Sequence, residues 1–124
     1  MDIVDAHHHL WDLSVRDQGW ITGAALAPIR RNFDLDDLAP ETRAAGVASS
    51  VLVQTVDVAE ETPEMLALAA NSDLIGAVVG WTDLTAPDVD AALAALCLGL
   101  GGQFLASIRH QVQSEPEPDR KSVV

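Results

Sequence analysis

The sequence predicts an α/β fold built on a parallel sheet. Short runs that are apolar throughout alternate with segments whose apolar residues recur at helical spacing. Strands of a parallel sheet have this composition, because crossover helices cover both faces of the sheet. Right-handed crossovers leave two architectures, a doubly wound open sheet or a β/α barrel, and the pattern alone does not separate them.

Four segments are expected to form the strands of this sheet. Each is short and mostly apolar, and each is followed by polar residues: 3–9, 49–54, 74–81 and 104–110. Residues 10–33 carry glycine, proline and two tryptophans without a clear period. We therefore expect a long loop between the first strand and the first helix.

Three helices are expected between the strands. The first covers residues 34–45 and is followed by Gly46, which suits the position after a helix end. The second is expected to begin with Thr62 as its N-cap, because a proline follows at the first helical position. Thr85 and Asp88 resemble a capping box in front of the third.

The composition restricts the class of protein. The net charge of -12 repels phosphate backbones, so we expect no nucleic-acid partner. No apolar run approaches the roughly 20 residues that span a bilayer, and no secretory signal opens the chain, so no membrane partner is expected either. Cys97 is the only cysteine and is expected in the core, which leaves no intrachain disulfide. These features are typical of a soluble cytoplasmic protein.

Polar residues at the carboxyl ends of the strands are the candidate functional residues, since both architectures place their sites there. The first strand ends in His7, His8 and His9. Because strand side chains alternate, His7 and His9 share one face while His8 points to the other. Two imidazoles on one face can bind one divalent metal ion or hold a substrate oxyanion.

The other strand ends supply four further candidates. Gln54 ends the second strand, Trp81 the third, and Arg109 with His110 the fourth. A guanidinium can hold a carboxylate or a developing oxyanion in fork geometry. Arg109 and His110 cannot both face inward on a straight strand, and Arg109 is favoured. Gln54 suits a strand cap as well as a site, and Trp81 suits a core more often than a ligand wall.

One motif resembles a known family. The segment Val4-Asp5-Ala6-His7-His8-His9-Leu10-Trp11 resembles the His-x-His motif that opens the barrels of the amidohydrolase superfamily. Four later segments follow in the order seen in its sugar-lactonase branch: 28–33, 51–54, 79–84 and 108–113. The resemblance implies that residues 1–118 form the N-terminal half, about four β/α units, of a TIM-type (β/α)8 barrel. It also implies a hydrolase that acts on a sugar lactone or a related small cyclic ester.

The resemblance also implies roles for the candidate residues. His7 and His9 would polarise the lactone carbonyl, with or without a divalent metal such as zinc, and no organic cofactor is implied. Arg109 would orient the substrate, and Gln54, Trp81 and His110 are further candidates for binding it. A carboxylate at the last strand would activate water. The alternative is a metal-dependent decarboxylase of the same superfamily, which the segment 108–113 fits less well.

The chain is short for a whole barrel, which needs eight strands and about 250 residues. No residue here suits the water-activating aspartate, so we expect an inactive fragment that at most binds metal weakly through His7 and His9. Its open sheet edges would favour self-association. Residues 119–124 match the translation of a common sequencing adapter, so a non-native tail is expected there; an ordinary polar tail is the alternative.

Overall fold

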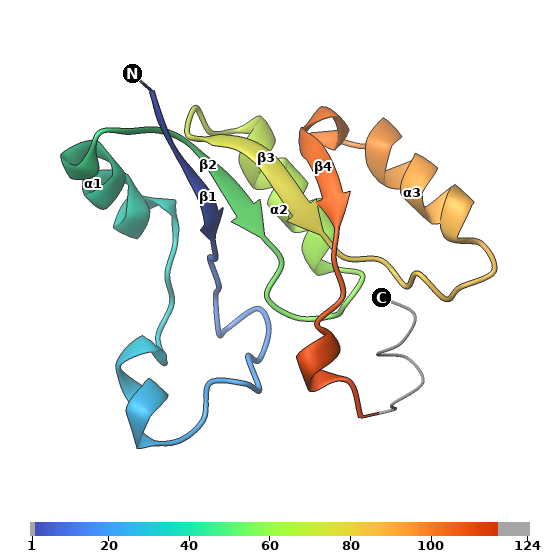
Figure 1. The fold of residues 1–124 in the computed structure, drawn as a ribbon, viewed down its shortest axis with the longest axis horizontal. Helices are drawn as coiled ribbons and strands as arrows, with labels where there is room; N and C mark the ends of the chain where they lie inside the picture. The colour runs from blue at the N-terminus through green and yellow to red at the C-terminus, as the bar shows by residue number, and fades with distance from the viewer. Residues whose placement is uncertain (1, 117–124) are drawn as a thin grey trace.

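A computed structural model describes residues 2–116, so the expected non-native tail at 119–124 lies outside the described residues. Within the described part, four strands form one sheet: β1 (Ile3–His8), β2 (Val47–Val53), β3 (Ile75–Gly80) and β4 (Leu105–Ile108). The spatial order is β1-β2-β3-β4, and all neighbours are parallel (Figure 1). A doubly wound sheet reverses its strand order at a switch point, and this sheet does not. The predicted class, parallel strands wound as in half of a β/α barrel, is confirmed.

Three α-helices connect the strands, and shorter 3-10 helices lie in the loops. The α-helices are α1 (Leu35–Ala45), α2 (Glu61–Ala70) and α3 (Val89–Leu98), and the 3-10 helices cover Ala24–Ile29, Gly102–Phe104 and Val112–Ser114. The long loop that follows β1 lies beyond the carboxyl ends of the strands (Figure 1). No helix among the described residues is long and apolar enough to cross a membrane.

The predicted ends of α1 are confirmed by its caps. The side chain of Asp34 accepts from the backbone N–H of Asp37, and the side chain of Asp37 accepts from the backbone N–H of Asp34. Gly46 ends the helix in the left-handed conformation, at φ 72°, which a residue without Cβ adopts easily. Local sequence signals at both ends therefore agree with the fold.

The predicted starts of α2 and α3 are wrong. Glu60, not Thr62, is the N-cap of α2, and it makes no side-chain capping bond. The hydroxyl of Thr62 instead accepts from the backbone N–H of Trp81 and donates to its carbonyl, each at 2.8 Å. Asp88 precedes α3 but makes no side-chain capping bond. The hydroxyl of Thr85 donates to Oδ1 of Asp83 instead. Long-range and loop contacts here outweigh the local capping preference.

The core lies between the sheet and α2. Its buried members, contributed by β2, α2 and β3, are Leu52, Met65, Leu66, Ala69, Ile75 and Val78. Leu52 and Val78 are paired in register, so both point to the helix-covered face. Helix α3 contributes no buried residue, and Cys97 is exposed, which corrects the expectation of a core cysteine.

The contact between α2 and β3 requires a glycine at position 80. A Cβ on Gly80 would lie 2.5 Å from Cγ2 of Thr62 and 2.9 Å from its Oγ1. Gly80→Ala is therefore expected to lower the free energy of unfolding by about 2 kcal/mol, measured by urea denaturation. Gly19→Ala is the control, since its Cβ would meet nothing closer than 4.0 Å. Equal urea midpoints for the two variants would contradict this packing argument.

His8 lies on the same buried face and leaves two polar atoms unpaired. It is paired in register with Leu52, is only 9% exposed, and neither ring nitrogen has a hydrogen-bond partner among the described residues. Burial lowers its pKa below the usual 6.5, although Asp5 opposes this shift. The native ring thus resists protonation, while the ring of the unfolded chain takes up a proton as the pH falls below 6.5.

His8→Leu should therefore flatten the dependence of stability on pH. Above pH 6.5 both states of the wild-type ring are neutral, and the variant gains about 1 kcal/mol because the unpaired polar atoms are gone. As the pH falls below 6.5, the wild-type chain loses stability that the variant keeps. Urea midpoints measured on both sides of that value check this, and a constant difference between the two proteins would refute it.

Candidate active site

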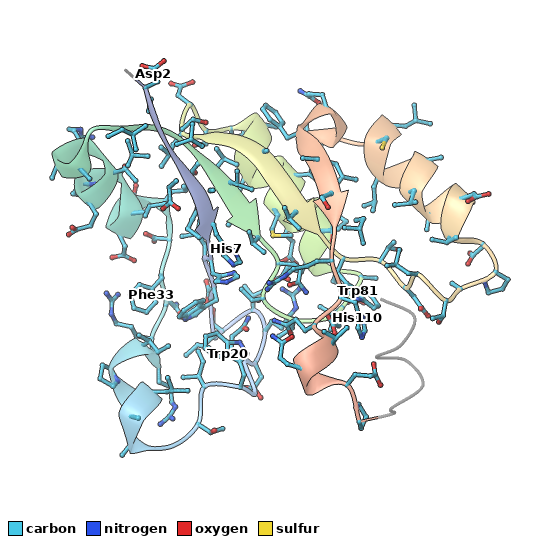
Figure 2. All side chains as sticks on the ribbon, in the orientation of Figure 1. Asp2, His7, Trp20, Phe33, Trp81 and His110 are labelled. Carbon is cyan, nitrogen blue, oxygen red and sulfur yellow. The ribbon has the colours of Figure 1, made fainter. Side chains whose placement is uncertain are left out.

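The carboxyl ends of the strands bring the predicted site residues to one end of the sheet. Figure 2 shows His7 at the end of β1, and Trp81 with His110 at the ends of β3 and β4. His7 and His9 lie on one face, with their Nε2 atoms 3.1 Å apart, whereas His8 is buried on the other. The alternation expected from a strand therefore places two imidazoles side by side.

The tautomer of His9 is fixed by the neighbouring strand. Its Nδ1 lies 2.8 Å from the carbonyl oxygen of Val53, and a carbonyl only accepts, so Nδ1 carries the proton. The Nε2 lone pair of neutral His9 therefore faces His7. Burial lowers the pKa of His9; the Val53 bond opposes this shift, and the nearby charges of His7 and Arg109 reinforce it. His9 is thus a neutral ring at neutral pH, and its Nε2 lone pair accepts from the Nε2–H of His7.

This pair suits two positions of a divalent metal site. Two imidazole nitrogens bound tetrahedrally to one zinc ion lie about 3.3 Å apart, close to the separation seen here. The backbone carbonyl behind His9 is the usual kind of outer partner for a metal-binding imidazole. Residues 2–116 contain no cluster of three or more metal-binding side chains, so this part of the chain offers two ligands.

Arg109 and Gln54 form the second part of the site. The Nε–H of Arg109 donates to Oε1 of Gln54 at 2.5 Å, and Nη2 donates to the backbone oxygen of Gln54 at 3.0 Å. Gln54 is completely buried. Desolvation lowers the pKa of Arg109, an effect that Asp57 and Glu61 oppose, but a guanidinium keeps its charge at neutral pH. Arg109 is therefore a fixed cation close to the imidazole pair.

Trp81 and His110 form the third part. The indole Nε1–H of Trp81 donates to Nδ1 of His110 at 3.0 Å, so the proton of the neutral ring is on Nε2. That nitrogen lies 2.9 Å from Oε2 of Glu115, which accepts from it. The hydrogen-bond partners of His110 thus differ from that of the Arg109 side chain, which is Gln54.

Two carboxylates that hold this end of the sheet together were not anticipated. Oδ1 of Asp57 accepts from Nε2 of Gln54 at 3.0 Å and from the backbone N–H of Gln111 at 3.4 Å. Glu61 is 5% exposed and accepts from the backbone N–H of Thr55 at 2.8 Å and from the hydroxyl of Thr55. Acidic residues just after a predicted strand end are a signal that could have identified them.

The long loop after β1 is fixed to the same region. Nε2 of Gln18 donates to the hydroxyl of Thr55 at 2.9 Å, and Trp20 donates to Oε1 of Gln18 at 2.8 Å. A cavity of about 270 Å³ lies between this loop and α2, but none of the six predicted site residues lines it. The convergence of the imidazoles and the guanidinium, rather than this cavity, identifies the candidate site.

Comparison with known proteins identifies the family of the chain. The family model described as amidohydrolase matches residues 4–122. Two curated relatives are each named L-fucono-1,5-lactonase. The protein of Burkholderia ambifaria is 38% identical over 93 residues, 75% of this chain and 32% of the relative. The protein of Burkholderia multivorans is 35% identical over 114 residues, 92% of this chain and 37% of the relative. The chain therefore spans about a third of the length of these relatives.

Solved structures support the same relationship. A Burkholderia multivorans amidohydrolase, solved with bound HEPES in one crystal form and with bound zinc in another, has a TM-score of 0.82 at 34% identity. Each match covers 94% of this chain and 39% of the other. An amidohydrolase from Bifidobacterium longum subsp. infantis, at 23% identity and a TM-score of 0.52, covers 78% of this chain and 48% of its own, and supports the fold alone. With a family match over nearly its whole length, the chain belongs to the amidohydrolase family.

Proposed function

We propose that this chain supplies the substrate-polarising part of a sugar-lactone hydrolase. The observation that carries the proposal is the imidazole pair of His7 and His9, with Nε2 atoms 3.1 Å apart, and with the cationic Arg109 close enough to affect the pKa of His9. The names of the two curated relatives favour an aldonolactone as the substrate, and L-fucono-1,5-lactone is the first to test.

The chemistry of lactone opening explains the use of these groups. When water attacks the ring carbonyl, negative charge develops on the carbonyl oxygen, and donors already in place stabilise that charge. His7 and His9 would hold that oxygen through a divalent cation, which the zinc-bound neighbour favours, because Nε2 of neutral His9 carries a lone pair and has no proton to donate. Such a cation, bound to these two rings, would act as a Lewis acid on the carbonyl. Arg109 would orient the lactone, with Trp81 and His110 beside it.

Activation of the attacking water is a separate requirement. No carboxylate within residues 2–116 forms a metal-binding cluster with the imidazole pair. We therefore expect these 124 residues alone to bind the ring without opening it. Proton release from L-fucono-1,5-lactone, followed with a pH indicator, should stay at the uncatalysed rate when the chain is added. Turnover above that rate would contradict the expectation that these residues bind the lactone without opening it.

Binding to a stable analogue tests the site directly. L-fucono-1,5-lactam keeps the ring carbonyl but resists hydrolysis, whereas L-fucose has the same ring without the carbonyl. In the presence of zinc, the lactam should shift the imidazole NMR signals of His7 and His9 and the guanidinium signal of Arg109. L-fucose, the matched control, should not. Equal shifts with both ligands, or none with the lactam, would overturn the proposal.

A further inference from the structure

We propose that Gln54 is a positioning residue, which holds Arg109 so that one end of its guanidinium faces the substrate. The sequence suggested Gln54 as a residue that binds substrate, and its buried contacts favour this indirect role. The inference rests on the proposed function in one respect, because it takes Arg109 to be the group that meets a substrate oxygen.

The polar atoms of the Gln54 side chain are already occupied. Its Oε1 accepts from Nε of Arg109, and its Nε2 donates to the carbonyl of Val56 at 3.1 Å and to Oδ1 of Asp57 at 3.0 Å. The residue is 0% exposed. A ligand at the carboxyl ends of the strands would therefore have to break buried hydrogen bonds to reach this amide.

The same contacts fix which way the amide points. The carbonyl of Val56 and the carboxylate of Asp57 only accept, so the NH2 group must face them. A flipped amide would place its oxygen against these two acceptors and its NH2 group against the N–H of Arg109. Asp57 thus sets the orientation of Gln54, and Gln54 in turn presents an acceptor to Arg109.

The bonds to Gln54 determine which edge of the Arg109 guanidinium is left to bind a substrate. A guanidinium has five N–H donors, and Gln54 uses one on Nε and one on Nη2, which are the two donors of the side-on edge. Three donors remain, and two of them, one on Nη1 and one on Nη2, form the end-on edge. A substrate group with two acceptor oxygens would therefore meet Arg109 end-on, in bidentate geometry.

The first measurement follows the Nε–H signal of Arg109, identified by its loss in Arg109→Lys. In Gln54→Met this proton should exchange with solvent about tenfold faster, because its buried acceptor is gone. Gln18→Met is the matched control. It also removes a buried glutamine, but one whose side chain bonds to Thr55 and Trp20 and not to Arg109. Unchanged exchange in folded Gln54→Met, or equal acceleration in both variants, would overturn the inference.

A second variant keeps the test decisive if Gln54→Met fails to fold. Asp57→Ala keeps Gln54 but removes one of the two acceptors that orient its amide, so the Nε–H of Arg109 should exchange faster than in the wild-type chain, and unchanged exchange would count against the inference. Titration with L-fuconate, the carboxylate product of the proposed reaction, then measures the consequence for binding. Its affinity should fall about tenfold in Gln54→Met and stay unchanged in Gln18→Met. Equal affinity in all three proteins would refute the positioning role.

The two measurements separate this inference from the proposed function. If the wild-type chain shows no shift of its Arg109 signals with L-fuconate, the proposed function fails. The exchange experiment still decides, without any ligand, whether Gln54 holds Arg109 in place.

Discussion

Replacing Glu61 with alanine is expected to lower the free energy of unfolding by about 3 kcal/mol. The carboxylate is buried and accepts from the backbone N–H groups of Thr55 and Val56, at 2.8 and 3.3 Å, and from the Thr55 hydroxyl. Without it, these donors remain buried and unpaired. Because domains are stable by only about 5–15 kcal/mol, urea denaturation should show a large fall in midpoint.

Glu64→Ala, on the same helix, is the control for this prediction. Glu64 pairs with Arg16 at 3.0 Å, but its side chain is 49% exposed, and exposed ion pairs contribute about 1 kcal/mol or less. The fall in the free energy of unfolding should therefore be several times smaller in Glu64→Ala than in Glu61→Ala. Similar losses for the two variants would mean that the buried hydrogen bonds of Glu61 do not stabilise the loop after β2.

Replacing His9 with alanine is expected to abolish zinc binding at the imidazole pair. Loss of a direct ligand should weaken binding by more than the roughly 10–100-fold that loss of an outer-shell partner costs. Calorimetric titration with zinc should show weak binding to the wild-type chain, because two imidazoles leave other positions unfilled. His7→Ala should have the same effect, since both rings point to one place.

The run of three histidines supplies its own control. His8 lies between the two proposed ligands in sequence, but its ring is buried on the opposite face of β1. His8→Leu should therefore bind zinc as the wild-type chain does. If His8→Leu weakened binding as much as His9→Ala, zinc would be held by a local histidine cluster rather than by one face of the strand.

The layers of the fold were predictable because they depend on the period of apolar residues. Each of the four predicted strands overlaps an observed strand, with ends that differ by a few residues. The apolar period alone did not separate a barrel from an open sheet; the family resemblance implied the barrel, and the strand order agrees with it. The start of α2 was wrong for a related reason: Thr62 has the chemistry of an N-cap, but its hydroxyl is used by Trp81, 19 residues away.

The candidate site was predictable to the extent that it follows strand alternation. The side-by-side placement of His7 and His9 depends only on their spacing within β1. The placements of Asp57 and Glu61 depend on how the loop after β2 turns back toward Arg109 and Thr55, a tertiary feature. The contacts of Gln54 could not be predicted for the same reason, because they join two strand ends that lie 55 residues apart.

The hydrogen bond from His9 to the carbonyl of Val53 has a kinetic consequence. It sets the ring angle and the tautomer when β1 pairs with β2, before any ligand arrives. An incoming cation would find the lone pair already aimed and would need no slow rotation or proton shift of that ring. Association should then be limited by diffusion and by the loss of water from the ion, so its observed rate should rise in proportion to the concentration of the reactant in excess, without reaching a plateau.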